Sequence, residues 1–217
     1  MMKFKSEREM IIDAVNRLHK AGLIINTSGN VSIKIGEHII ITPSAAAYKN
    51  LIPTDILVMS QDKKVVEGNL LPSSEVDLHY SIYKKYESIK AIVHTHSLYA
   101  TAVSSITNEL PAIHYQIVDL GGIIPVAPYK TFGSCELASV VVENICGKNA
   151  VLMQNHGAVT IATNLEKALS RSILLEWLCS LYLISKQSGK PSLIEQPELA
   201  AVKNQMKKYQ KMREEFI

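Results

Sequence analysis

Tight turns between strand-like runs place the strongest constraint on how this chain can fold. The runs VSIKI (31–35) and HIIIT (38–42) are separated by a single Gly-Glu dipeptide, a spacing typical of a two-residue β-hairpin. The runs ILVMS (56–60) and VVEG (65–68) form a second pair of this kind. Parallel strands need a crossover of a dozen or more residues. The sequence therefore predicts a largely antiparallel sheet.

Helical segments alternate with these strands, so helices should pack on the sheet. A capping box formed by Ser6 and Glu9 predicts the start of the first helix, and Gly22 predicts its end. The run IHYQIVD (113–119) is expected to be a strand. Further helices are predicted from Ser73 or Ser74 onward and over about 98–107, 134–146 and 164–187. The fold class is α/β.

Chain length and composition predict one globular domain over residues 1–217. No apolar stretch approaches the roughly 20 residues that span a bilayer, and the start MMKFKSEREMIIDAV lacks the features of a signal peptide. We therefore expect a cytoplasmic protein with no membrane partner. A net charge of +3 is too small to indicate nucleic-acid binding. The basic run near the C-terminus is expected to be a solvated helix face.

Two histidines stand one residue apart in IVHTHS (92–97). On a β-strand, His94 and His96 would share one face, which is the geometry of a metal chelate. A single histidine there is more often a hydrogen-bonded core residue. Two imidazoles desolvated together are satisfied more readily by a metal ion.

A catalytic zinc usually has three protein ligands and one open position. Among the remaining histidines, His156 follows a strand and lies in the sharp turn NHG, where its side chain can be presented at a sheet edge. His19 and His38 are expected at the surface. His79, one helical turn after Glu75, is a candidate packing residue or a support for the ligands.

Glu75 is the candidate acid/base group, because a helix N-terminus favours its carboxylate. Taken alone, it is better explained as an ordinary first-turn residue. Small polar residues at 27–30, 42–45 and 73–74 are candidate anion-binding loops. Together with three histidines, these loops indicate a metal next to a phosphate.

Motifs of other enzyme classes are missing from the sequence. It contains neither a GxxxxGK[ST] phosphate loop nor a GxGxxG dinucleotide fingerprint. Zinc hydrolases that continue HxHxDH would have aspartate at position 98, which is leucine here. Cupin-like oxygenases place a glutamate shortly after HxH, and residues 97–103 contain none.

Eight motifs in register resemble the class II aldolase and epimerase superfamily, and within it the L-fuculose-1-phosphate aldolase group. In order, they are TSGNVS, ITPS, EGNLLPSSE, VHTHS, PAIHY, APYKTFG, QNHG and a late Tyr209. The resemblance implies a three-layer α/β/α fold around an antiparallel sheet. It also implies a homotetramer with active sites between neighbouring subunits.

The resemblance also assigns roles to residues. It implies one zinc ion per subunit, bound by His94, His96 and His156, with Glu75 as a resting-state ligand that leaves the metal and becomes the base. Tyr115 of the adjacent subunit would protonate the aldehyde oxygen. The substrate-binding residues would be Gly29, Asn30, Ser44, Ser73 and Ser74 for the phosphate, and Phe132 and Tyr209 for the aldehyde.

The implied reaction is reversible cleavage of a ketose 1-phosphate, such as L-fuculose 1-phosphate, to dihydroxyacetone phosphate and a small aldehyde such as L-lactaldehyde. Breaking the C3–C4 bond leaves a carbanion equivalent at C3, which a Lewis-acidic metal stabilises. A glutamate released beside that carbon can act as the base. The phosphate contacts supply binding energy away from the bond that breaks.

Two positions differ from what the family patterns suggest. The family commonly has glycine where this chain has Ala45, and alanine takes a positive φ only at a cost, so we expect the phosphate loop to differ. Ribulose-5-phosphate 4-epimerases typically carry aspartate at the position of Glu75, which favours an aldolase here. Asp119 lies in a region that supplies an acid/base group to epimerases, so that activity stays open.

The same metal ligands are compatible with further functions. An aldolase for 5-deoxyribulose 1-phosphate or 5-methylthioribulose 1-phosphate, or a related dehydratase, would use nearly the same residues around the metal. A zinc-binding structural or regulatory protein would instead keep Glu75 on the metal, because structural zinc sites are usually closed by four protein ligands.

Overall fold

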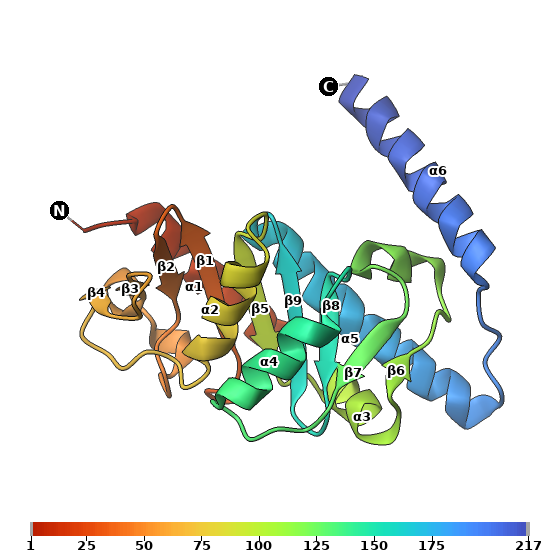
Figure 1. The fold of residues 1–217 in the computed structure, drawn as a ribbon, viewed down its shortest axis with the longest axis horizontal. Coiled ribbons are helices and arrows are strands. Elements are labelled where there is room, and N and C mark those ends of the chain that lie inside the picture. The colour runs from red at the N-terminus through yellow and green to blue at the C-terminus, as the bar shows by residue number, and fades with distance from the viewer. Residues whose placement is uncertain (1, 216–217) are drawn as a thin grey trace.

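A nine-stranded sheet forms the centre of the molecule in the computed structural model, which describes residues 2–215 (Figure 1). The strand order is β4-β3-β2-β1-β5-β9-β8-β7-β6. All pairs are antiparallel except β7 with β8. The strands are β1 (Asn30–Ile35), β2 (His38–Ile41), β3 (Leu57–Met59), β4 (Val65–Glu67), β5 (Ala91–Thr95), β6 (Glu109–Leu110), β7 (Ile124–Ala127), β8 (Ala150–Met153) and β9 (Gly157–Ala162).

Helices cover both faces of this sheet. In Figure 1, α2 and α4 lie in front of the sheet, and α1 and α5 lie behind it. The α-helices are α1 (Lys5–Lys20), α2 (Val76–Lys85), α3 (Leu98–Ile106), α4 (Cys135–Asn144), α5 (Leu165–Ser188) and α6 (Gln196–Glu215), with 3-10 turns η1 (Tyr48–Asn50), η2 (Pro53–Asp55) and η3 (Tyr115–Leu120). The three-layer α/β/α fold with a largely antiparallel sheet is confirmed.

Side chains of the central strands alternate between two hydrophobic cores. On β5, Val93 packs with the residues of α1 and α5, whereas Ile92 packs with those of α2 and α4. Because neighbouring side chains of a strand point to opposite faces, His94 lies on the same side as Ile92. The α2 face of the sheet therefore carries the histidine.

Both predicted hairpins form, but three local predictions were wrong. The first helix begins at Lys5 after Phe4, whose φ is 55°, and no side chain caps it, so the capping box at Ser6 is absent. The run 113–119 contains the 3-10 turn η3, because the side chain of His114 accepts a hydrogen bond from the backbone N–H of Gln116 and Gly121 ends the turn with a φ of 94°. Helix α2 begins at Val76, which leaves Glu75 at the N-cap position.

Strand β9 was missed by the sequence analysis, although AVTIA after Gly157 is rich in β-branched and small residues. It pairs with both β5 and β8 and is therefore an interior strand of the sheet. A three-residue turn, Gln154 to His156, joins β8 to β9. This turn is the signal that would have identified the strand.

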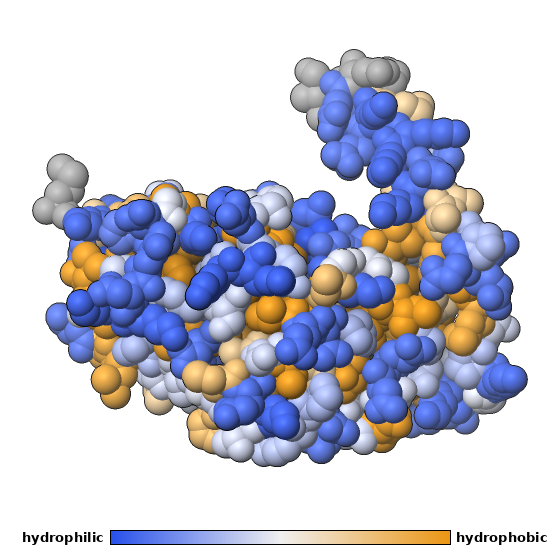
Figure 2. Space-filling model, viewed as in Figure 1, coloured by the Kyte–Doolittle hydropathy of each residue, from blue (hydrophilic) through white to orange (hydrophobic). Residues whose placement is uncertain are grey.

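Contrary to the expectation that no apolar stretch is long enough, helix α5 could cross a membrane by length and composition alone. It packs beneath the sheet against α1, α3, β5 and β9, and it buries the polar side chains of Arg171 and Ser172. These contacts are those of a core helix. Helix α6 extends away from the body, and Figure 2 shows mainly hydrophilic side chains on it, in agreement with the predicted solvated face.

Candidate active site

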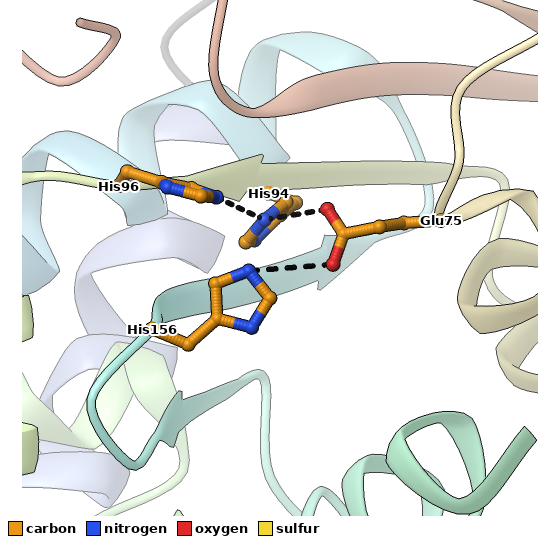
Figure 3. A group of neighbouring side chains, drawn as sticks. All are labelled: Glu75, His94, His96 and His156. Atoms are coloured by element: carbon orange, nitrogen blue, oxygen red, sulfur yellow. Dashed lines mark hydrogen bonds and ion pairs between the residues drawn. The ribbon is translucent and has the colours of Figure 1, made fainter. Parts of the chain in front are cut away.

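Glu75, His94, His96 and His156 converge on one point from three places in the fold (Figure 3). His94 lies on β5 and His96 directly after it, while Glu75 caps α2 and His156 lies in the β8–β9 turn. One ligand atom from each residue lies within 4.8 Å of all the others. A tetrahedral ion with bonds of about 2.0–2.1 Å separates its ligand atoms by roughly 3.3 Å. The predicted quartet is therefore assembled at the scale of a metal site.

The hydrogen bonds of His94 show why a cation fits this cluster. Nδ1 of His94 lies 3.0 Å from the carbonyl oxygen of Ala158, which only accepts, so Nδ1 carries the proton of the neutral ring. Nε2 then presents a lone pair, yet it lies 2.9 Å from Oε2 of Glu75. Two acceptors at this distance require a proton or a metal ion between them.

Oε1 of Glu75 gives a second reason why a cation fits this cluster. This oxygen is buried and has no hydrogen-bond partner among the described residues. Nε2 of His156 lies 3.3 Å from it, close enough for an ion pair but without the alignment of a hydrogen bond. A buried carboxylate oxygen without a hydrogen bond lowers the stability of the folded protein. A bound cation would satisfy this oxygen.

The surroundings keep Glu75 ionised and His96 and His156 neutral, which are the protonation states that bind a metal ion. Burial opposes ionisation of Glu75, but the neighbouring His94 outweighs it and holds the pKa of this carboxyl below its usual range. Burial, followed by repulsion from His94, lowers the pKa of His96 to about 3 and that of His156 to about 4. Burial also lowers the pKa of His94, but Glu75 outweighs it and the net shift is upward.

Close backbone packing brings the ligand-bearing segments together. A Cβ at Gly157 would lie 2.2 Å from the carbonyl oxygen of Thr95, and one at Gly29 would lie 2.7 Å from that of His94. Asn155, in the turn before Gly157, has a φ of 54°. The positions of His94 and His156 therefore depend on glycine at 29 and 157, where any side chain would collide with the neighbouring backbone.

All three predicted anion-binding loops line a single cavity of about 130 Å³ beside the cluster. Ser73 Oγ accepts a hydrogen bond from the backbone N–H of Glu75 at 3.2 Å. The cavity combines hydroxyl and backbone groups with the carboxylate and two of the imidazoles. It is lined by Thr27, Ser28, Gly29, Asn30, Pro43, Ser44, Ala45, Tyr48, Ser73, Ser74, Glu75, His96, Phe132 and His156.

Tyr48 is a site residue that the sequence analysis missed. Its hydroxyl donates a hydrogen bond of 2.5 Å to the carbonyl oxygen of Gly29, and burial raises the pKa of this phenol to about 12. The side chain is 3% exposed. Tyr48 therefore fixes the loop at Gly29, and only the tertiary contact reveals it.

Ala45 has a left-handed backbone in the predicted phosphate loop. Its φ is 52°, and it lines the cavity with Ser44. The fold thus imposes a left-handed backbone at this position despite the Cβ, at a cost of about 1–2 kcal/mol.

Two of the predicted residues lie outside this cavity in the single chain. Tyr115 and Tyr209 line a separate groove of about 840 Å³ between η3 and α6. Phe132, 68% exposed, does reach the cavity. Asp119 lies 3.6 Å from the buried guanidinium of Arg171, measured from Oδ1 to Nη2.

Comparison with known proteins places the chain in a family. The model of the Class II Aldolase and Adducin N-terminal domain matches residues 9–183. The 5-deoxy-D-ribulose 1-phosphate aldolase of Bacillus thuringiensis serovar kurstaki is 37% identical over 200 residues, which cover 91% of this chain and 94% of the relative. The L-fuculose phosphate aldolase of Escherichia coli K12 is 37% identical over 201 residues, which cover 92% and 93%.

Solved structures agree with this placement. A structure described as L-fuculose 1-phosphate aldolase has a TM-score of 0.90 and 33% sequence identity, over 93% of this chain and 96% of the other. The fold, the assembled Glu/His cluster and the relatives all indicate a metal-dependent lyase. This chain belongs to the class II aldolase family.

Proposed function

We propose that this protein is a zinc-dependent aldolase that reversibly cleaves a ketose 1-phosphate to dihydroxyacetone phosphate and a small aldehyde. One observation carries the proposal: the Glu75 and histidine cluster opens directly into a cavity lined by three loops of hydroxyl and backbone groups. A metal and a phosphate can therefore be bound side by side, as a phosphorylated ketose requires.

The three histidines would hold the metal through neutral imidazole nitrogens, as structural and catalytic zinc sites do. The bound ion would supply Lewis acidity at the oxygens next to the reacting carbon. In the condensation direction, Glu75 takes a proton from C3 of dihydroxyacetone phosphate. Asn30, whose Nδ2 donates to Oε2 of Glu75 at 3.0 Å, keeps one carboxylate oxygen oriented.

The phosphate would bind to Gly29, Asn30, Ser44, Ser73 and Ser74. These residues surround the cavity, and no Lys or Arg side chain lines it among the described residues, so hydroxyls and backbone N–H groups would supply the hydrogen bonds. Binding there positions C3 beside Glu75 and contributes free energy far from the bond that breaks.

The aldehyde side of the site would be completed by a second copy of the chain. Tyr115 and Tyr209 lie in a groove separate from the cavity of their own chain, and a homotetramer with active sites at its interfaces would bring the Tyr115 of a neighbouring copy to the metal. There its hydroxyl protonates the aldehyde oxygen as the C3–C4 bond forms. Phe132 and Tyr209 would shape the pocket.

Two aldehydes fit the comparisons equally. The relatives named for L-fuculose phosphate and for 5-deoxy-D-ribulose 1-phosphate are each 37% identical to this chain. Both substrates share the C1–C3 part that the phosphate loops would hold. They differ only at the aldehyde end, which the neighbouring copy would complete.

A direct assay tests the proposal. Zinc-loaded protein is given L-fuculose 1-phosphate, 5-deoxyribulose 1-phosphate, 5-methylthioribulose 1-phosphate or L-ribulose 5-phosphate, and release of dihydroxyacetone phosphate is measured. Release that depends on zinc supports the aldolase, and the highest kcat/KM identifies the aldehyde. Conversion of L-ribulose 5-phosphate to its epimer, with no release from any ketose 1-phosphate, would overturn the proposal.

A further inference from the structure

A buried polar chain runs away from Glu75 along the contact between α2 and β1. Glu75, His79 and Tyr83 are spaced four residues apart at the start and along one face of α2. Asn30 and Ser32 are spaced two apart on β1 and face them. Helical and strand periods bring such residues into register, so the five side chains alternate between the two elements.

Each neighbouring pair in this chain is within hydrogen-bond distance. Asn30 Nδ2 lies 3.0 Å from Glu75 Oε2, and Asn30 Oδ1 lies 2.5 Å from Nε2 of His79. Nδ1 of His79 lies 2.6 Å from Ser32 Oγ. Ser32 Oγ lies 2.8 Å from the hydroxyl of Tyr83.

The chemistry of these groups fixes the direction of every bond. Asn30 must turn its amide NH2 toward the carboxylate, which leaves only its carbonyl for His79. His79 therefore carries its proton on Nε2, and Nδ1 accepts from the hydroxyl of Ser32. Ser32 Oγ, having given its proton to His79, can only accept from the hydroxyl of Tyr83, which also lies 3.1 Å from the carbonyl oxygen of Ser32. All the donors point toward Glu75.

His79 is neutral in this environment. It is 0% exposed, and burial, reinforced by the nearby His94, lowers its pKa to about 3. Asn30 is 3% and Ser32 0% exposed. Water therefore has little access to replace any bond of the chain.

We propose that His79 is a positioning residue, which holds the Asn30 amide in the one orientation that donates to Glu75. If the amide rotated by half a turn, its carbonyl oxygen would face the carboxylate and repel it. The N–H of His79 opposes the same rotation from the other side, because the rotated amide would turn its NH2 toward this N–H and set two donors against each other. This inference rests on the proposed function, in which the Glu75 carboxylate must stay oriented toward C3 of the substrate as it takes a proton.

A matched pair of variants tests the proposal. In His79→Gln, the longer amide can place an N–H where Nε2 stood and keep the bond to Asn30. In His79→Asn, the shorter amide reaches Ser32 but not Asn30. The measurement is exchange of the C3 proton of dihydroxyacetone phosphate with deuterated solvent, without aldehyde, together with zinc content and Tm.

We expect His79→Asn to exchange about 10–100-fold more slowly than wild type, the usual loss when a supporting hydrogen bond is removed. His79→Gln should stay within about threefold of wild type, with zinc content and Tm matching those of His79→Asn. Equal exchange rates in the two variants at equal zinc content would overturn the role of His79. If zinc-loaded wild type shows no exchange, the proposed function fails instead.

A second measurement does not depend on the folding of a variant. Nitrogen NMR of wild-type holoenzyme labelled in its histidines distinguishes a protonated from an unprotonated ring nitrogen. The proposal expects His79 as the Nε2–H tautomer, and assignment to the Nδ1–H tautomer would overturn it.

Discussion

Glu75 Oε2 and His94 Nε2 lie 2.9 Å apart, although the backbone bond from Nδ1 of His94 leaves Nε2 without a proton in the neutral ring. In the metal-free protein, a proton shared between the two groups resolves this conflict, in agreement with the raised pKa of His94. A metal ion would occupy the same place. Metal and proton therefore compete for Nε2 of His94.

Zinc binding should release about one proton from this site near neutral pH. The proton comes from His94, because His96 and His156 are already neutral there, with pKa values lowered to about 3 and 4. Calorimetric titration of metal-free protein with zinc, in buffers of different ionisation enthalpy, measures the number of protons released per zinc ion bound. Release of no proton, or of three, would contradict this assignment.

Replacing Glu75 with glutamine should leave zinc bound by the three histidines but lower turnover by a factor of about 10²–10⁴, the usual contribution of a general base. The amide keeps the shape of the carboxyl but cannot take a proton from carbon. Glu87→Gln serves as a control, because Glu87 is an exposed residue outside the cavity. Turnover near wild type in Glu75→Gln would remove Glu75 from the base role.

Gly157→Ala should disrupt the metal site by steric clash. The added Cβ would lie 2.2 Å from the carbonyl oxygen of Thr95, so β5 and β9 must move apart next to His96 and His156. We expect a loss of at least about 2 kcal/mol in the free energy of unfolding and weaker zinc binding. Urea unfolding and zinc titration measure these effects.

Gly147→Ala is a control for a glycine-to-alanine change outside the cavity. Gly147 has a φ of 69° and nothing within 4 Å of an added Cβ, so it reports backbone strain alone, of about 1–2 kcal/mol. Its zinc affinity should equal that of wild type. If the two variants bind zinc equally well, the contact between Gly157 and Thr95 does not maintain the site.

Ala45→Gly should stabilise the protein or leave it unchanged, unlike most alanine-to-glycine changes. Glycine removes the backbone strain of a φ of 52° at this position, which stabilises the folded state by about 1–2 kcal/mol. The greater entropy of the unfolded chain with glycine offsets about 0.5–1 kcal/mol of this gain. Ala102→Gly, inside α3, should instead destabilise by about 1 kcal/mol. Urea unfolding compares the two, and a loss at Ala45 as large as that at Ala102 would refute the strain.

The metal-free protein should lose stability as the pH falls from about 6.5 toward 4. Burial lowers the pKa of His79 and His96 to about 3 and that of His156 to about 4. Between these values and 6.5 the unfolded chain binds protons that the folded chain does not, so stability present at pH 7 is progressively lost. His94, with its raised pKa, adds no slope in this window, because it is protonated in both states.

Urea unfolding with a chelator at pH 7.5 and pH 5 measures this dependence. Each histidine contributes up to about 1.4 kcal/mol per pH unit, so the midpoint at pH 5 should be clearly lower. His79→Gln removes one of the three groups and should show a weaker dependence. A midpoint that is unchanged or higher at pH 5 would contradict the burial of neutral histidines.

Local sequence by itself determined the parts of this protein that depend on near neighbours. The Gly-Glu turn fixed the β1–β2 hairpin, because two residues allow no other pairing. The alternation of His94 with its neighbours placed it on one face of β5, and the NHG turn placed His156 at the end of β8. Motifs in family order were enough to predict the four side chains that converge in the structure.

Only the tertiary structure decided the properties that depend on residues far apart in the chain. The pairing of β9 with β5 joins distant parts of the chain, and the role of Tyr48 follows from one bond to Gly29. The left-handed φ of Ala45 runs against local preference and is imposed by the surrounding loops. The order of donors from Tyr83 to Glu75 exists only because α2 lies on β1, since neither element alone brings hydrogen-bonding partners within reach.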